Sequence, residues 1–370
     1  MESRFTLGIE EEFQLVDQQT GELRSCADAI IAKGANSLGE QLKQEMSQST
    51  IELVSNVLAD IATARKEVRA TRAELARLVN EEGLAIISAG THPSSSWRDQ
   101  ANTEGERYIE LAEEYQDVVR SDLIFGLHVH VGVANKDLAI TILNQVRTWL
   151  PHILALSTNA PFWSGRMTGL KSYRAVQWKR FPRSGVPYVF PSWDHFDKYV
   201  QDLIDMGCID DGKKIWWDVR PHAFFDTVEF RVCDMPSTME DTLAIAALCQ
   251  AMVAKLARLH VEGKSVPIVK SRYIEENKWR AMRYGLDAEY VDFPQQRRLP
   301  MRDSIRELLA FVDDVVDELG SRREITYLHD LLDDRQGTGA DRQMAIYQET
   351  QNTQKVIEFL LDRTMQGVYL

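Results

Sequence analysis

The stretch Gly8-Ile9-Glu10-Glu11-Glu12-Phe13 indicates the fold and the kind of site most directly. It belongs to an alternating pattern over residues 5–16 that predicts a strand, with Glu10 and Glu12 about 6.5 to 7 Å apart on one face. The other face is apolar except at Glu11, which we expect at the margin of the sheet or in a bulge. The pattern therefore predicts a sheet with one face on the core and one face that carries carboxylates.

Two later stretches repeat this pattern. Leu127-His128-Val129-His130-Val131 places two histidines on one face of a strand, and Thr227-Val228-Glu229-Phe230-Arg231-Val232 does the same with an acidic and a basic residue. A further candidate strand over residues 46–54 adds Glu52. Carboxylates on a shared surface repel each other unless a cation neutralises them, and Mg²⁺ prefers carboxylate oxygens. We therefore predict a metal site with the ligands Glu10, Glu12, Glu52, His128, His130 and Glu229.

Each of these motifs alone also fits an ordinary structural role. A solvated edge strand would explain the glutamates, hydrogen bonds in the core would explain the histidines, and a cross-strand ion pair would explain Glu229 with Arg231. All of them, however, lie on the polar faces of strands whose other faces are apolar. This convergence favours the metal site.

A basic segment complements the acidic strands. Residues 159–191 are rich in proline, glycine, arginine and lysine, and a segment of this length inside a domain is often functional. Arginine and lysine beside a metal stabilise the phosphates of a nucleotide triphosphate, and the chain has no GxxxxGK[ST] motif that would indicate a P-loop. We therefore predict a cofactor-binding set, with Arg174 and Arg231 also catalytic, that consists of Lys171, Arg174, Arg220 and Arg231.

Composition limits the classes of partner. The chain has 370 residues, 44% of them hydrophobic, and a net charge of -13, which disfavours binding to nucleic acid or to an anionic membrane. Four cysteines show no metal-binding spacing, no basic and apolar leader opens the chain, and no window has the uninterrupted apolar length of a membrane span. These features predict a cytoplasmic protein.

Helical periodicity and capping residues predict the remaining organisation. We expect one catalytic domain over residues 1–370, in which residues 237–370 form a mainly helical part packed on the rest. The expected helices span about 58–82, 106–121, 135–157, 192–206, 238–262, 270–283, 302–318, 322–334 and 340–364.

Several motifs, in this order along the chain, resemble those of the type-two glutamate–cysteine ligase family of carboxylate-amine ligases. The motifs are Gly8-Ile9-Glu10-Glu11-Glu12-Phe13, Gly90-Thr91-His92-Pro93, Gly126-Leu127-His128-Val129-His130-Val131-Gly132, Trp217-Asp218-Val219-Arg220-Pro221, Thr227-Val228-Glu229-Phe230-Arg231-Val232 and Arg283-Tyr284-Gly285-Leu286. The resemblance implies an α+β, glutamine synthetase-like fold with a curved, mainly antiparallel sheet of about six strands flanked by helices.

The resemblance also implies an activity. We expect an ATP-dependent ligase that uses Mg²⁺ or Mn²⁺ to join a small carboxylate to an amine through an acyl phosphate, with weak glutamate–cysteine ligase-type activity. The amphipathic C-terminal helices and the family suggest a homodimer or a higher even assembly. A metal-dependent amide hydrolase that uses the same cluster without ATP is the alternative, and a non-catalytic nucleotide or metabolite sensor is a more distant one.

Overall fold

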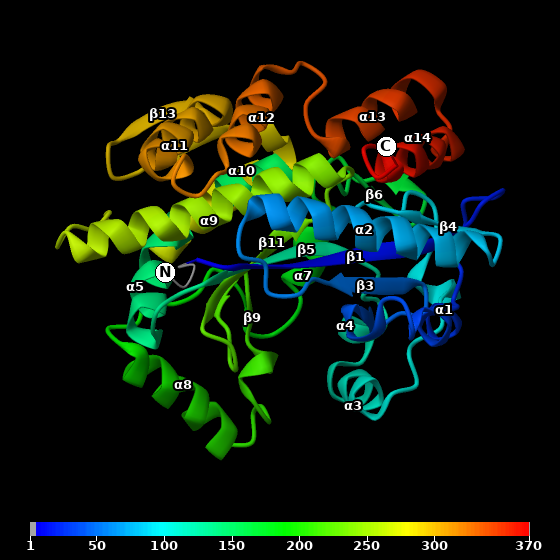
Figure 1. Ribbon diagram of the computed structural model, residues 1–370, viewed down its shortest axis with the longest axis horizontal. Coiled ribbons are helices and arrows are strands. Elements are labelled where there is room, and N and C mark those ends of the chain that lie inside the picture. The colour runs from blue at the N-terminus through cyan, green and yellow to red at the C-terminus, as the bar shows by residue number, and fades with distance from the viewer. Residues whose placement is uncertain (1–4, 370) are drawn as a thin grey trace.

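The central sheet carries the strands that the sequence predicts. In the computed structural model, which describes residues 5–369, seven strands pair antiparallel in the order β10-β11-β5-β1-β3-β2, and β4 also pairs with β1 (Figure 1). The predicted α+β fold with a mainly antiparallel sheet is confirmed. The strands are β1 (Leu7–Asp17), β2 (Leu42–Gln44), β3 (Thr50–Val54), β4 (Leu84–Ile87), β5 (Gly126–Gly132), β10 (Val219–Pro221) and β11 (Thr227–Asp234).

The register of the sheet brings the predicted polar residues together. Glu10 lies opposite His128, Glu12 lies opposite Glu52, and His130 lies opposite Glu229 on the next strand. Alternate residues of β1 point the other way, and Ile9 and Phe13 are fully buried there, as expected for a period of two. One face of the sheet is therefore apolar and the opposite face is polar.

Helices α2 (Ile61–Asn80) and α9 (Met239–Val261) cover the apolar face (Figure 1). A capping box of Thr238 and Asp241 begins α9, which is buried on nearly all sides. This helix is long and apolar enough to span a membrane by composition, but 83% of its apolar window is buried inside the protein. Its hydrophobicity therefore reflects a position in the core.

Glu11 lies on this apolar face, neither at the margin of the sheet nor in a bulge. The pairing of β1 continues on both sides of it, and its carboxylate forms a two-point ion pair with Arg72 of α2. Both side chains are at most 2% exposed. The expectation for Glu11 was wrong because a cation on a helix 61 residues away, which strand periodicity does not show, compensates its burial.

Three predicted helices are each divided. The helix predicted over residues 106–121 becomes two helices, Glu106–Tyr115 and Asp117–Arg120, which are separated at Gln116, where φ is 50°. The helix predicted over residues 135–157 becomes two α-helices, because Pro151 has no N–H to continue the first one and opens the second. The helix predicted over residues 340–364 is interrupted at Gln351, whose φ of 52° is left-handed, and Asn352 caps the next helix.

The remaining helices follow the expected order, with the short α1 and α7 added. They are α1 (Ala27–Gly34), α3 (Glu106–Tyr115), α4 (Asp117–Arg120), α5 (Lys136–Val146), α6 (Leu150–Ser157), α7 (Tyr173–Trp178), α8 (Trp193–Asp205), α10 (Ser271–Tyr284), α11 (Met301–Val316), α12 (Arg322–Asp333), α13 (Gly339–Thr350) and α14 (Thr353–Met365). The strand predicted over residues 46–54 is confined to Thr50–Val54. Small two-stranded sheets, which the sequence analysis did not separate, contain β6 (Phe162–Trp163), β7 (Arg166–Met167), β8 (Ser184–Gly185), β9 (Trp216–Trp217), β12 (Glu289–Asp292) and β13 (Arg297–Pro300).

Candidate active site

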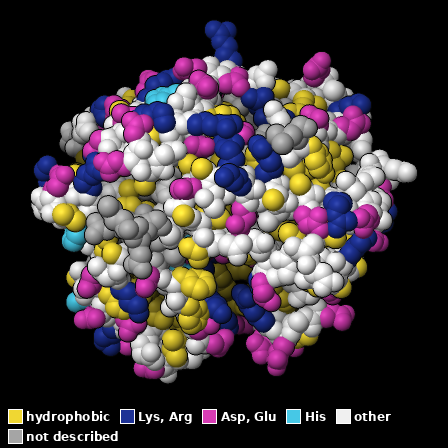
Figure 2. Space-filling model, in the orientation of Figure 1, with side chains coloured by type: hydrophobic (Ala, Val, Ile, Leu, Met, Phe, Trp, Pro, Cys, Tyr) yellow, Lys and Arg dark blue, Asp and Glu magenta, His cyan; other side chains and the backbone are white. Residues whose placement is uncertain are grey.

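A cavity of about 290 Å³ lies against the polar face of the sheet. Side chains of β1, β3, β5 and β11 form one wall, and α3, α4, α7 and the segment before β10 form the others. Figure 2 shows that this side of the molecule is hollowed in its lower half, where basic and hydrophobic side chains surround the opening. The cavity therefore combines charged and apolar surfaces.

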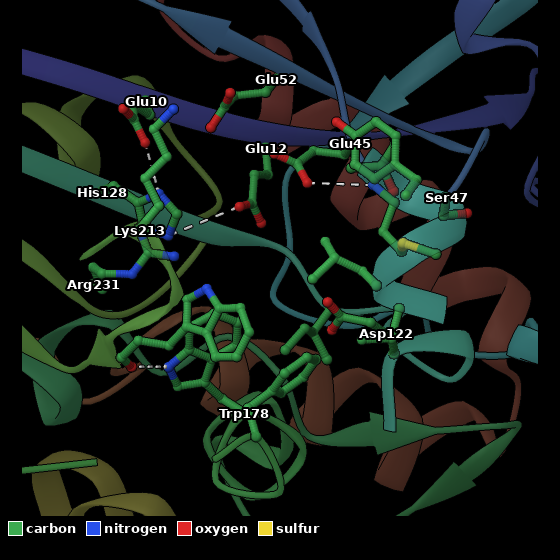
Figure 3. Close-up of a pocket in the computed structure, with 18 of the residues that line it drawn as sticks. Glu10, Glu12, Glu45, Ser47, Glu52, Asp122, His128, Trp178, Lys213 and Arg231 are labelled. Carbon is green, nitrogen blue, oxygen red and sulfur yellow. Dashed lines mark hydrogen bonds and ion pairs between the residues drawn. The ribbon is translucent and has the colours of Figure 1, made fainter. Parts of the chain in front are cut away.

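Five of the six predicted metal ligands form two groups of possible donors. Glu10, His128 and Glu229 make one group, and Glu12, Glu52 and His128 make the other. Within each group the donor atoms lie within 4.8 Å of one another. His128 belongs to both groups, and Figure 3 shows it between Glu10 and Glu12. The geometry therefore offers two adjacent sites that share one histidine.

Hydrogen bonds distinguish the two predicted histidines. Nδ1 of His128 lies 2.8 Å from Glu10, whereas its buried Nε2 has no hydrogen-bond partner among residues 5–369. His130 places Nε2 3.0 Å from Glu10 and Nδ1 3.2 Å from the hydroxyl of Thr227. Both nitrogens of His130 are thus engaged, and it lies beside the two donor groups. His130 therefore contacts Glu10 but is a member of neither donor group.

Among residues 5–369, no lysine or arginine forms an ion pair with the carboxylates of the second group, and Glu12 lies 3.8 Å from Nε2 of His128. Burial, followed by the charges of Glu10, Glu45 and Glu12, raises the pKa of Glu52 well above its usual value. Burial and the charge of Glu12 also raise the pKa of Glu45 to about 8. Buried carboxyl groups whose pKa values are raised by one another indicate a site where a bound cation would favour their ionised form.

The first group is electrostatically different. Burial alone would raise the pKa of Glu229, but the charges of Arg220 and Arg231 hold it well below its usual range. Arg220 donates to both carboxylate oxygens of Glu229, at 2.7 and 3.2 Å, and also to two backbone carbonyls. Glu229 therefore stays ionised, and Arg220 is positioned to hold it in place.

Two further predicted arginines line the cavity. Arg231 forms an ion pair with Glu229, and its guanidinium lies 5.3 Å from the ring centroid of Trp178. Arg174 is 2% exposed and donates to the carbonyl of Arg231 at 3.4 Å. A Cβ at residue 126 would lie 2.2 Å from the guanidinium of Arg174, so a glycine at this position leaves space for that guanidinium. The local sequence thus places two guanidinium groups beside the donor groups.

Lys171 lies away from this cavity. Its ammonium contacts Asp287 at 2.8 Å and Asp341 at 2.5 Å, which ties the basic segment to the C-terminal helices. It is also absent from the lining of the cavity. The structure therefore does not support Lys171 as a cofactor-binding residue, because its ammonium group forms ion pairs with two aspartates that are distant in the sequence.

Several lining residues are missing from the sequence-based prediction. Glu45 follows the short strand β2, Asp122 precedes β5, and neither lies within an alternating pattern. A charged residue just before the histidine strand is the one signal that could have indicated Asp122. The other lining residues outside the prediction include Arg107, Tyr108, Phe181, Lys213 and His222.

Comparison with solved structures defines the class of fold. The glutamate–cysteine ligase of Francisella tularensis, solved in complex with AMP, matches with a TM-score of 0.74 and 13% identity over 99% of this chain and 89% of its own. The bifunctional glutathione synthetase of Pasteurella multocida matches with a TM-score of 0.70 and 14% identity, over 99% of this chain and 53% of its own. The fold is that of the glutamate–cysteine ligases, a class of ATP-dependent ligases.

Sequence comparison identifies the family. The model of the family described as glutamate–cysteine ligase family 2 matches residues 6–359. Proteins named "Putative glutamate--cysteine ligase 2" are similar in Solibacter usitatus (46% identity, 98% of this chain, 94% of the relative) and in Sorangium cellulosum (48%, 100% and 98%). The chain belongs to glutamate–cysteine ligase family 2, as the motifs suggested.

Proposed function

We propose that the protein joins a small carboxylate, such as glutamate, to an amine at the expense of ATP, and that an acyl phosphate is the intermediate. The arrangement that carries this proposal is the pair of donor groups that share His128, with two arginines beside them. A site for phosphoryl transfer needs such a combination of metal ligands and guanidinium groups.

The donor set suits a divalent ion. Carboxylate oxygens with one imidazole nitrogen fit Mg²⁺ or Mn²⁺, and the unpartnered Nε2 of His128 leaves a donor atom free for such an ion. A neutral imidazole has one free lone pair, so His128 would hold an ion with either Glu10 and Glu229 or Glu12 and Glu52, and the two carboxylates of the other group would hold a second ion. When bound, these ions would neutralise the carboxylates and the phosphate oxygens of ATP.

The arginines have separate roles in this proposal. Arg231 and Arg174 would stabilise the negative charge on the transferring phosphoryl group, because both reach the cavity and keep a buried Nε without a partner in the described chain. Arg220 would act as a positioning residue, because its two bonds to Glu229 fix the direction of that carboxylate.

An assay of ADP and phosphate release tests the proposal. Purified protein with Mg²⁺, ATP and glutamate should release both products only when a suitable amine from a panel is added. Absence of amine-dependent release with every amine would contradict the ligase proposal. A parallel arm without ATP tests the amide hydrolase, which would cleave an amide there. Tight ATP binding without turnover would instead indicate a sensor.

A further inference from the structure

Asp122 lies in the wall of the cavity that faces the donor groups. It follows α4 and comes just before β5, and Figure 3 shows it across the cavity from Glu10 and His128. Its carboxylate belongs to neither donor group. Oδ1 of Asp122 is buried and has no hydrogen-bond partner in the described part of the chain. The proposed metal and phosphate contacts therefore leave this group unused.

An unpartnered, buried carboxylate oxygen at this place is costly, because nothing in the described chain replaces the water it loses. Burial, followed by the charge of Glu12, raises the pKa of Asp122 to about 7. Arg174, Arg180 and Arg231 lower the pKa by a smaller amount. A cationic ligand in the cavity would satisfy Asp122, and a group with a pKa near neutrality is well suited to accept a proton.

The surface beside Asp122 is apolar. Met46, Val119 and Phe181 form a small cluster that is separate from the main core, and Leu111 and Trp178 pack against it. All five of these side chains also line the cavity. The space next to the carboxylate thus suits a small apolar substituent, whereas the opposite wall suits metal ions and phosphate.

We propose that Asp122 binds the acceptor amine as its ammonium ion and accepts the proton that the ammonium loses, while the neighbouring apolar cluster holds the amine's side chain. This inference rests on the ligase function proposed above. After proton transfer to Asp122, the nitrogen lone pair attacks the acyl-phosphate carbonyl, the C–N bond forms, and the C–O bond to the phosphoryl group breaks. The second nitrogen proton leaves with phosphate, and Asp122 returns its own proton to solvent.

Hydroxylamine separates this role from the earlier steps. It is uncharged at neutral pH and small, so it should trap the acyl phosphate as a hydroxamate without needing a carboxylate to bind and deprotonate it. The experiment measures hydroxamate formation and amide formation with ATP, Mg²⁺ and glutamate, for the wild type and for Asp122→Asn. Asp117→Asn is the matched control, because the Asp117 side chain is 81% exposed on the adjacent helix and does not line the cavity.

Asp122→Asn should lower kcat/KM for the amine by roughly 100-fold and change hydroxamate formation by less than threefold. Asp117→Asn should leave both rates unchanged. Equal losses in both reactions would overturn the inference, because Asp122 would then act on the fold, the carboxylate substrate or ATP. Unchanged amide formation would overturn it as well. If the wild type itself forms neither product, the ligase proposal fails first.

Discussion

Three consecutive glutamates of β1 lie in different environments on the two faces of the strand. Glu11 points to the core and meets Arg72, so the fold itself neutralises its charge. Glu10 and Glu12 point to the cavity, where Glu45 and Glu52 add two carboxyl groups whose pKa values are raised. Glutamates of the same strand are therefore structural on one face and available to a ligand on the other. The comparison of Glu11 with Glu12 teaches that a carboxylate indicates function when no lysine or arginine in the described part of the chain pairs with it.

Glu12→Gln should have the largest effect on the cavity face. It keeps the shape of the side chain but removes a charged donor from the group that also contains Glu52 and His128. Because metal ions supply several kcal/mol to such reactions, we expect ligase activity to fall by roughly 1,000-fold or more, with the circular dichroism unchanged. The exposed Glu22→Gln is the control. Activity within tenfold of the wild type would show that Glu12 does not take part in the reaction.

Glu11→Gln changes the apolar face of β1 and should lower the stability of the protein. It leaves Arg72 buried without its counter-charge, and we expect the free energy of unfolding to fall by about 3–5 kcal/mol in urea denaturation. The kcat of the folded protein should stay within threefold of the wild type. The double variant Glu11→Met with Arg72→Met should recover most of the lost stability. A loss of activity without a loss of stability would reverse the assignment of the two faces.

Glu45 makes the stability of the metal-free protein depend on pH. Its pKa of about 8 in the fold exceeds the value of 4.5 for an unperturbed glutamate, so unfolding between these pH values releases a proton. Rising pH therefore favours unfolding in this window, and stability should fall from about pH 5 to pH 8. Glu45→Gln should reduce this fall by about 2 kcal/mol, as measured by denaturation in EDTA. An identical pH dependence in the variant would contradict the shift.

Lys171→Met should give the smallest effect. The Lys171 side chain is 9% exposed, and its partners Asp287 and Asp341 are 62% and 19% exposed, so loss of these ion pairs should cost about 1–2 kcal/mol of stability. The KM for ATP should stay within twofold, because Lys171 lies outside the cavity. Arg174→Met provides the comparison, since it should weaken the use of ATP. A tenfold rise in KM for ATP in Lys171→Met would restore the sequence-based prediction for this residue.

Local sequence patterns determined how much of the fold and of the candidate site could be predicted. The period of two within β1, β5 and β11 was sufficient to predict the polar face. Each strand has its own alternating polar residues, and the register of the sheet places them opposite one another. The C-terminal helices were predictable apart from the break at Gln351. Glu45 and Asp122 reach the cavity through tertiary structure, and the partners of Glu11 and Lys171 are distant in the sequence. Periodicity and charge alone contain no information on such partners.

The transfer of oxygen from substrate to phosphate tests the central claim most directly. Glutamate labelled with oxygen-18 in its side-chain carboxylate is converted with ATP, Mg²⁺ and an accepted amine, and the phosphate product is analysed by mass spectrometry. Attack of the carboxylate on ATP at the metal and arginine site predicts that each phosphate released contains an oxygen from glutamate. Amide formation with unlabelled phosphate would contradict the account, because the carboxylate would not have passed through an acyl phosphate.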